Sequence, residues 1–246
     1  MIEHPHAYDR RLVAWLSLAQ LISWGSLFYA FALFMEPVER ALGLSRVQSS
    51  LAFSLALLVE GLVAYPVGRW IDQGHERVVI TVGSVAAAVG LAWHSQISSL
   101  AGFYAVWAWL GAAMAAILYA PVFSVVTRRF PHDFRRAIIT LTFLGGLAST
   151  VFLPLTASLI HGLGWRQALM WLALTHLVVC APLHFYCLRH APPAVKVESM
   201  SGSALPNQLS HHVLSAPFLL IAVFIVLMMG VTVALPAHMI SLLREN

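Results

Sequence analysis

The stretch Gly68–Val79, GRWIDQGHERVV, decides the fold because it is a short polar joint between two long apolar runs. From Ser50 to the joint the residues are apolar or small apart from Glu60, and after the joint they are apolar again up to Trp93. The joint concentrates side chains that carry or can carry charge: Arg69, Asp72, His75, Glu76 and Arg77. Two apolar segments with a charged connection are typical of helices that cross a membrane in succession.

The composition of the whole chain points to the same environment. Of its 246 residues, 60% are hydrophobic and only 10% are charged, and the mean hydropathy is +0.81. A soluble domain usually carries about 25% charged residues. Because this chain has too few charges to cover a water-facing surface, we expect it to be embedded in lipid.

Apolar runs of near-spanning length occur seven times. Uninterrupted runs exclude a transmembrane barrel, whose strands are short and alternate in polarity. Helices satisfy their own backbone hydrogen bonds in lipid, so the sequence predicts an all-α membrane protein. The predicted spans are Leu12–Met35, Ser50–Ile71, Val78–Trp93, Leu100–Val126, Ala137–Ile160, Gln167–Leu188 and Ala216–Leu235.

A stretch rich in proline, serine and histidine separates the seventh span from the other six. The predicted organisation is a cytoplasmic N-terminus (1–11), a six-helix transmembrane bundle (12–189), a cytoplasmic linker (190–215) and a seventh transmembrane helix (216–246), expected to start a missing second half. Short glycine-containing joints follow the second and fifth spans, QGHERVV and GLGWRQA. They suggest two sets of three helices in opposite orientation, an inverted repeat found in secondary transporters.

The basic residues predict the orientation. Ten of the 14 lysines and arginines lie in the N-terminal segment and the even-numbered joints, and four lie on the opposite side. The positive-inside rule therefore places the N-terminus in the cytoplasm. The pI of about 9.4 does not predict a nucleic-acid partner, because the basic residues form no single patch.

Other functional classes lack their motifs. The sequence has no histidine box, Ser–His pair or acidic metal motif at a membrane interface, so we expect neither an enzyme nor a cofactor or metal site. His176 and His184 do not provide the four clustered ligands of a structural zinc site. A retinal pump needs a lysine in its last span, whereas the only lysine, Lys196, is in the linker. A non-transporting membrane protein, either seven-helix receptor-like or a structural or interaction protein, is the alternative to a transporter.

The joint resembles the loop signature of the major facilitator superfamily: a glycine, an aspartate four residues later, a second glycine and basic residues. Gly68, Asp72 and Arg77 match this spacing, whereas Gly74 lies one position before the family's second glycine and Glu76 occupies a basic position. Other segments, among them LYAPVFSVVTRRF (118–130) and GWRQAL (164–169), are similar to the bacterial branch of monocarboxylate and oxalate/formate carriers.

The sequence departs from the family pattern at two positions that bear on the kind of transport expected. Trp107 stands where many proton-coupled members have an arginine. Gly145 and Gly146 stand where drug/proton antiporters have Gly-Pro, which argues against drug efflux.

The resemblance implies secondary active transport of a small solute, expected to be a carboxylate, by alternating access. It implies a multi-pass protein of the bacterial inner membrane, whose partners are the bilayer, the substrate and a missing C-terminal half or a second copy. Gly68, Asp72 and Arg77 would form a cytoplasmic gate, with Gly68 admitting a close helix and Asp72 facing a helix N-terminus of the other half. Arg77 would join a charge network with Asp72 or Glu76. The alternative is that these charges only solvate a loop and set the topology.

Candidate site residues also lie inside the spans. Because the first and fourth helices line the central cavity in the family, Gln20, Trp24 and Tyr119 are candidates for substrate contact. Interhelical hydrogen bonding and packing are the alternative. Glu60 lies near the middle of the second span, where an acidic residue is costly, so it is a candidate for ion coupling or else a hydrogen-bonded structural acid. An anionic substrate would need its cation from the other half, because no Arg or Lys is predicted at mid-membrane.

Overall fold

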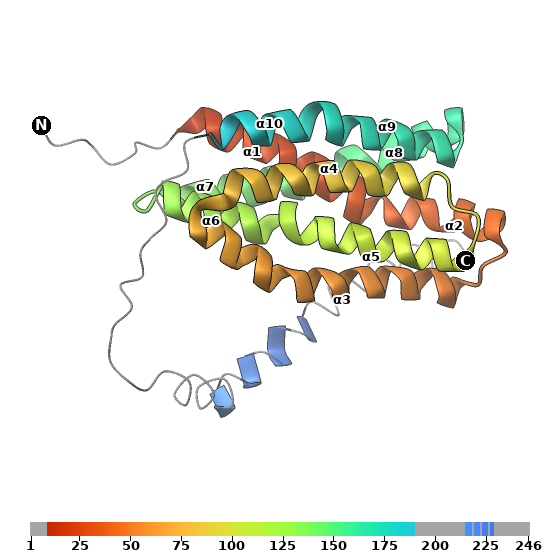
Figure 1. Ribbon diagram of the computed structural model, residues 1–246, viewed down its shortest axis with the longest axis horizontal. Helices are drawn as coiled ribbons and strands as arrows, with labels where there is room; N and C mark the ends of the chain where they lie inside the picture. The colour runs from red at the N-terminus through yellow and green to blue at the C-terminus, as the bar shows by residue number, and fades with distance from the viewer. Residues whose placement is uncertain (1–8, 190–214, 218, 222, 226, 229–246) are drawn as a thin grey trace, which may run out of the picture. The chain divides into compact units, whose positions relative to one another are not determined.

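The computed structural model describes residues 9–189, 215–217, 219–221, 223–225 and 227–228. They belong to two units, Met1–Val195 and Lys196–Asn246, which are considered separately. In the first unit every regular element among the described residues is a helix, and Figure 1 shows these helices lying side by side. The described residues from 216 to 228, within the predicted seventh span, are also helical. The rest of that span, residues 1–8 and most of the predicted linker (190–214) lie outside the described residues.

The first pass consists of α1 (Arg10–Ser23), a π-helical stretch η1 (Trp24–Tyr29) and α2 (Phe31–Leu42). Asp9 begins it as an N-cap, because its side chain accepts hydrogen bonds from two backbone N–H groups of the first turn. Gly43, with φ of 67°, ends it in the left-handed conformation that favours glycine. The pass therefore extends beyond the predicted end at Met35.

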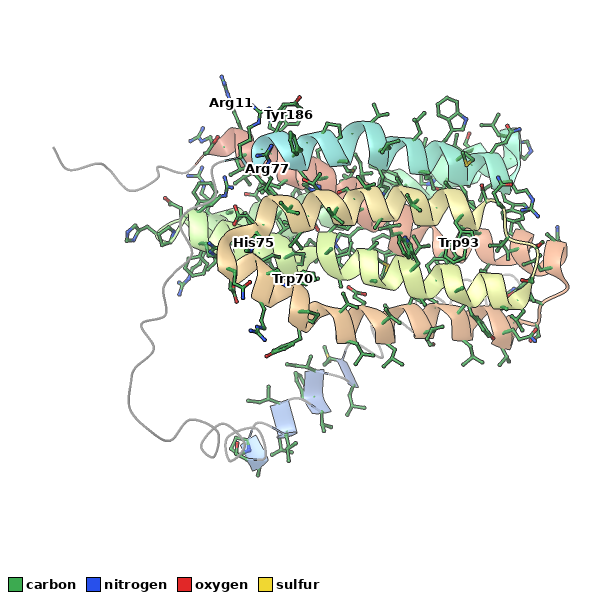
Figure 2. All side chains as sticks on the ribbon, in the orientation of Figure 1. Arg11, Trp70, His75, Arg77, Trp93 and Tyr186 are labelled. Atoms are coloured by element: carbon green, nitrogen blue, oxygen red, sulfur yellow. The ribbon has the colours of Figure 1, made fainter. Side chains whose placement is uncertain are left out.

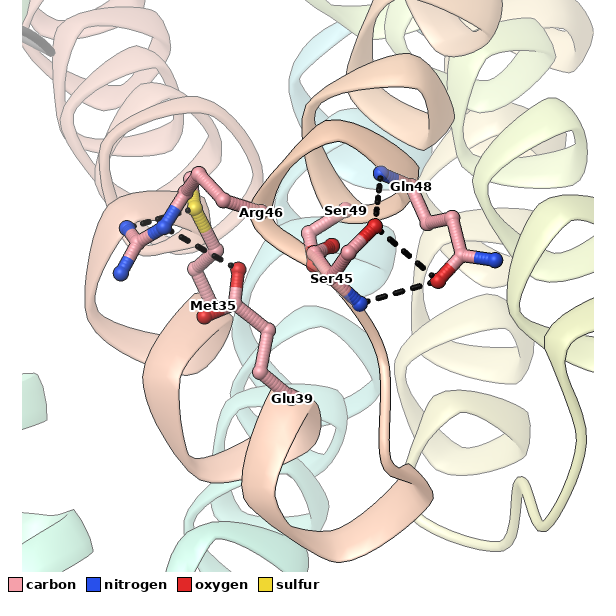
Figure 3. A network of polar contacts seen from close by, with 6 residues as sticks. All are labelled: Met35, Glu39, Ser45, Arg46, Gln48 and Ser49. Atoms are coloured by element: carbon pink, nitrogen blue, oxygen red, sulfur yellow. Dashed lines mark hydrogen bonds and ion pairs between the residues drawn. The ribbon is translucent and has the colours of Figure 1, made fainter.

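The second and third passes are α3 (Arg46–Trp70) and α4 (Glu76–His94), joined by the short η2 (Ile71–His75). A capping box begins α3: the Gln48 N–H donates to Ser45 Oγ, and the Ser45 N–H donates to Gln48 Oε1 at 2.9 Å. Figure 3 shows this box beside Arg46, whose Nε lies 3.3 Å from Glu39 Oε1 across the joint from α2. These contacts fix the turn between the first two passes.

Each of the remaining three passes contains an interruption. In the fourth pass Leu118, with ψ of −158°, separates α5 from α6. Between the fifth and sixth passes Gly164, with φ of 80°, makes the turn from α8 into α9. The helices are α5 (Leu100–Ile117), α6 (Tyr119–Arg129), α7 (Phe134–Gly146), α8 (Ala148–Leu163), α9 (Trp165–Thr175), η3 (His176–Cys180) and α10 (Ala181–Cys187).

Five helical stretches of the described residues are long and apolar enough to cross a membrane. The stretch from Arg46 to His94 contains a left-handed turn at Gly74 and supplies two passes. The described residues of the first unit therefore form six membrane passes. The prediction of an all-α membrane protein is therefore confirmed, while the inverted repeat stays a prediction.

Small residues bring the helices together. Figure 1 shows α5 between α3 and α4. A Cβ at Gly111 of α5 would collide with the backbone of Ala56 in α3, and a Cβ at Gly83 of α4 would lie 2.6 Å from the Ala116 side chain of α5. Helices in lipid associate through close packing at small residues, because a helix surface is no more apolar than the lipid tails it would otherwise contact. Trp107 of α5 is buried against aromatic rings, including Phe31 at 4.8 Å between ring centroids.

Candidate functional site

The polar joint of the sequence is the tight turn η2 between α3 and α4. Gly74 adopts φ of 89°, while His75, at the position of the family's second glycine, has φ of −87°. The left-handed residue of the turn is therefore the glycine that lies one position early. Gly68 lies on α3, and a Cβ added to it would meet nothing within 4 Å in the described part of the chain.

Glu76, the first residue of α4, is the centre of a buried ion cluster. Its side chain is fully buried, and its Oε1 accepts from Arg129 Nε at 2.8 Å and Nη2 at 2.5 Å. Arg128 Nη1 lies 3.6 Å from Oε2 and also donates to the Ile71 carbonyl. The acid stands at a helix N-terminus and the arginines at the C-terminus of α6, so both helix dipoles favour the arrangement. The cluster links α6 to both sides of the turn.

The two charged residues of the predicted gate, Arg77 and Asp72, are not part of this cluster. Arg77 donates from Nε to the Phe185 carbonyl of α10 at 3.0 Å, and its guanidinium carbon lies 3.8 Å from the centroid of that ring. Asp72 is exposed and has no hydrogen bond or ion pair with any described residue. The charge network expected for Arg77 with Asp72 or Glu76 is therefore not formed. Arg128 and Arg129, from the end of α6, take the place of Arg77.

Two of the three substrate-contact candidates come together. The Trp24 ring of η1 and the Tyr119 ring at the start of α6 have centroids 4.7 Å apart. Tyr119 follows the break at Leu118, and the glycine at 145 leaves room for its hydroxyl, which would lie 2.5 Å from an added Cβ. Both rings are partly exposed. Further partly exposed rings extend this aromatic face: Phe28, Tyr29, Phe53 and Phe123.

Gln20, the third candidate, is fully buried and has a different partner. Its Nε2 donates to the Ile117 carbonyl at 2.7 Å. In a continuous helix that carbonyl would accept from the residue four positions later, but this is Pro121, which has no N–H. Gln20 thus satisfies a backbone group left open by proline, at the break that presents Tyr119. A role for Gln20 in substrate contact stays a prediction.

Glu60 lies on α3 and is partly buried. No hydrogen bond or ion pair joins it to another described residue. The structure thus provides no structural partner for this acid in the described part of the chain.

Two buried histidines of the last pass bind serines of other passes. The His176 Nε2 lies 2.7 Å from Ser26 Oγ in η1, and His184 Nδ1 lies 2.8 Å from Ser84 Oγ in α4. From the sequence these histidines were candidates only for metal binding, which was not expected. The serines have no distinctive sequence pattern, so these pairs were not predicted.

Comparison with known proteins identifies a family and several relatives of this chain. A family model described as Major Facilitator Superfamily matches residues 16–244. The oxalate:formate antiporter of Oxalobacter formigenes is 27% identical over 147 residues, 59% of this chain and 35% of that protein. An uncharacterized MFS-type transporter, YcxA, of Bacillus subtilis (strain 168) is 23% identical over 185 residues, 74% of this chain and 45% of that protein. A 38 kDa uncharacterized protein in the 23S RNA operon of Thermoproteus tenax is 25% identical over 164 residues, 66% of this chain and 43% of that protein. The matched regions thus span less than half the length of these relatives.

Proposed function

This chain belongs to the Major Facilitator Superfamily, and we propose that it forms part of a secondary active transporter for a small carboxylate in the bacterial inner membrane. The family match over residues 16–244 carries the proposal of transport rather than catalysis. The likeness to an oxalate:formate antiporter supports the carboxylate class. The ten-to-four distribution of basic residues supports a cytoplasmic N-terminus.

The aromatic face around Trp24 and Tyr119 is the proposed wall of the substrate cavity. Its rings offer apolar area and the hydroxyls of Tyr29 and Tyr119. The only described hydrogen-bond partner of the Tyr119 hydroxyl is the Thr142 carbonyl at 3.4 Å. In the described passes the arginines lie at helix ends rather than at mid-span. We therefore expect the cation that binds the carboxylate to come from a C-terminal half or from a second copy of the chain.

Alternating access requires two helical bundles that rock about a site at their interface. In this proposal Asp72 contacts a helix N-terminus of the opposite bundle when the cytoplasmic side is closed. Glu60, which has no described partner, is the proposed coupling group. Gly68 and Arg77 lie on either side of Asp72 in the sequence. The open space beside Gly68 would admit the opposite helix, and the hydrogen bond from Arg77 to the Phe185 carbonyl ties this region to α10.

Deletion of the gene in the source cell tests the function. We expect the uptake of one labelled small carboxylate to fall and to be restored by the wild-type gene but not by Asp72→Asn or Tyr119→Ala. Tyr65→Ala is the matched control, because Tyr65 is 72% exposed on α3 and lies outside the aromatic face. If the uptake of another solute class falls instead, the carboxylate class is wrong, and unchanged uptake of every solute would refute transport.

Labelling of introduced cysteines tests the orientation. Ser98 and His132 lie in the joints after α4 and α6. With Cys180 and Cys187 replaced by alanine, we expect a cysteine at 98 to react with an impermeant reagent from the periplasm and one at 132 from the cytoplasm. Labelling of both from the same side would refute the orientation.

A further inference from the structure

A groove of about 480 Å³ lies between α3 and α4 in the first unit. Its walls come from these two helices, its floor from α5 and one end from η2. Most of the lining is valine, alanine or glycine, and the polar residues are confined to the end at η2. The lining residues are Val63, Val67, Trp70, Gln73, His75, Val78, Val79, Val82, Gly83, Ala86, Trp109, Ala112, Ala113 and Ala116.

The groove follows from how the helices pack. α3 and α4 each pack along α5, which lies between them (Figure 1). Gly83 lets α4 approach Ala116 closely, and the alanines of α5 leave empty space between the two walls. Residues on its walls face outward, with Val78 61% and Val82 58% exposed. Exposed valines on a membrane-spanning helix favour apolar surroundings, so we expect the groove to be filled by an apolar membrane component.

The length of the groove fits one leaflet of the bilayer. Trp109 closes its inner end, because its Nε1 donates to the Ala86 carbonyl of α4 at 2.7 Å. The α4 lining runs from Val78 to Ala86, and the eight helical steps between these residues span about 12 Å. Half of a hydrocarbon core is about 15 Å thick. An acyl chain that enters from the side of η2 would therefore occupy the groove nearly to the middle of the bilayer.

Basic residues gather at the η2 end. Figure 2 shows Trp70, His75 and Arg77 at one end of the bundle and Trp93 at the other. Outside the buried ion cluster of Glu76, Arg128 and Arg129, the charged groups at this end are Arg69, Arg77 and Asp72, a net charge of +1 with histidine neutral. Arg69 is exposed and has no partner among the described residues. It precedes the lining residue Trp70 and lies four positions before the lining residue Gln73. Such a surface attracts anionic lipid headgroups.

We propose that the groove between α3 and α4 binds one acyl chain of an anionic phospholipid, whose phosphate is held at η2 by Arg69, Gln73 and His75. The proposal depends on the membrane location of the chain and not on its transport activity. It assigns a lipid site to a groove whose lining shares no residue with the aromatic face proposed for the substrate.

Photolabelling of the full chain in proteoliposomes tests the site. The probe is phosphatidylglycerol with a diazirine in the middle of one acyl chain, and labelled residues are mapped by mass spectrometry. We expect labelling to be enriched at least several-fold on the groove lining over equally exposed residues elsewhere on α3, such as Leu58 (60% exposed) and Leu62 (69%). Val82→Trp should lower labelling of the α5 floor several-fold. Val89→Trp is the matched control, because Val89 is 51% exposed on the same helix but outside the groove.

A comparison of two lipids with different headgroups tests the proposed phosphate contact at η2. With the same diazirine on phosphatidylethanolamine, we expect weaker labelling of the groove, and Arg69→Gln should remove the difference between the two lipids. Arg11→Gln, an exposed arginine at the start of α1, should leave it unchanged. Equal labelling of the groove and of Leu58 and Leu62 in wild type would show ordinary surrounding lipid and overturn the site. A disulfide between two copies that carry a cysteine at Val78 would show that protein covers the groove, which would also overturn it.

Discussion

Replacing Arg129 by glutamine tests whether the buried ion cluster holds the turn η2 in place. Arg129 makes two hydrogen bonds to a carboxylate that is fully buried. Removing one partner of a buried ion pair typically costs about 3–5 kcal/mol, because the remaining charge is left without compensation. Arg128 stays 3.6 Å from the other carboxylate oxygen of Glu76, so we expect a loss near the lower end, about 3 kcal/mol. The free energy of unfolding is measured by denaturant titration in detergent.

The exposed pair of Arg40 and Glu36 is the matched control. Its N–O distance is also 2.5 Å, but its side chains are 79% and 41% exposed. Arg40→Gln should cost about 0.5 kcal/mol or less, as usual for an exposed pair four residues apart on a helix. Glu76→Gln combined with Arg129→Gln should recover part of the loss, because the double variant removes the buried carboxylate and leaves Arg128 with its hydrogen bond to the Ile71 carbonyl. If Arg129→Gln costs no more than Arg40→Gln, the cluster does not stabilise the turn.

Three further predictions follow from single contacts. Gln20→Leu should destabilise the chain by about 1–3 kcal/mol in denaturant titrations, because it leaves the buried Ile117 carbonyl unpaired; an unchanged free energy of unfolding would show that this hydrogen bond does not stabilise the break. Gly145→Ala should displace the Tyr119 ring and change the tryptophan fluorescence spectrum, whereas Gly146→Ala, with nothing within 4 Å of its added Cβ, should leave the spectrum unchanged. Asp72→Asn should change the unfolding free energy of the purified chain by less than about 0.5 kcal/mol, since an exposed carboxylate without a partner contributes little; a larger loss would reveal a partner within the chain.

The sequence predicted the passes because each apolar run is long and its ends carry polar or turn residues. The turn at Gly74 lies within the predicted joint, and the glycine that departs from the family spacing is the residue that adopts positive φ. Boundaries were less well predicted. The first pass continues seven positions beyond Met35, to Leu42, because its last two turns combine buried residues such as Val38 with an exposed ion pair.

Partners from distant passes were not predictable from local patterns. Glu76 looked like one more loop charge, yet it is buried by two arginines more than 50 positions later. The available signal was an acid that opens one span and adjacent arginines that close the next. Gln20 looked like a cavity residue because polar side chains on a cavity-lining helix attract that interpretation. Its actual partner was indicated by Pro121, which leaves the carbonyl four positions earlier without a donor.

The same contacts bear on how the bundle would move during transport. A bundle that rocks as a rigid body needs strong links inside it and weak, reversible contacts at its surface. Here the turn η2 is tied to α6 through Glu76, and the next residue, Arg77, ties α4 to α10. Asp72 lies in the same turn but is exposed and has no described partner. In the proposed mechanism it can therefore bind and release an opposing helix terminus without disturbing the contacts that hold its own bundle together. Loss of uptake in Asp72→Asn without loss of stability would support this separation, whereas parallel loss of both would place Asp72 among the structural contacts.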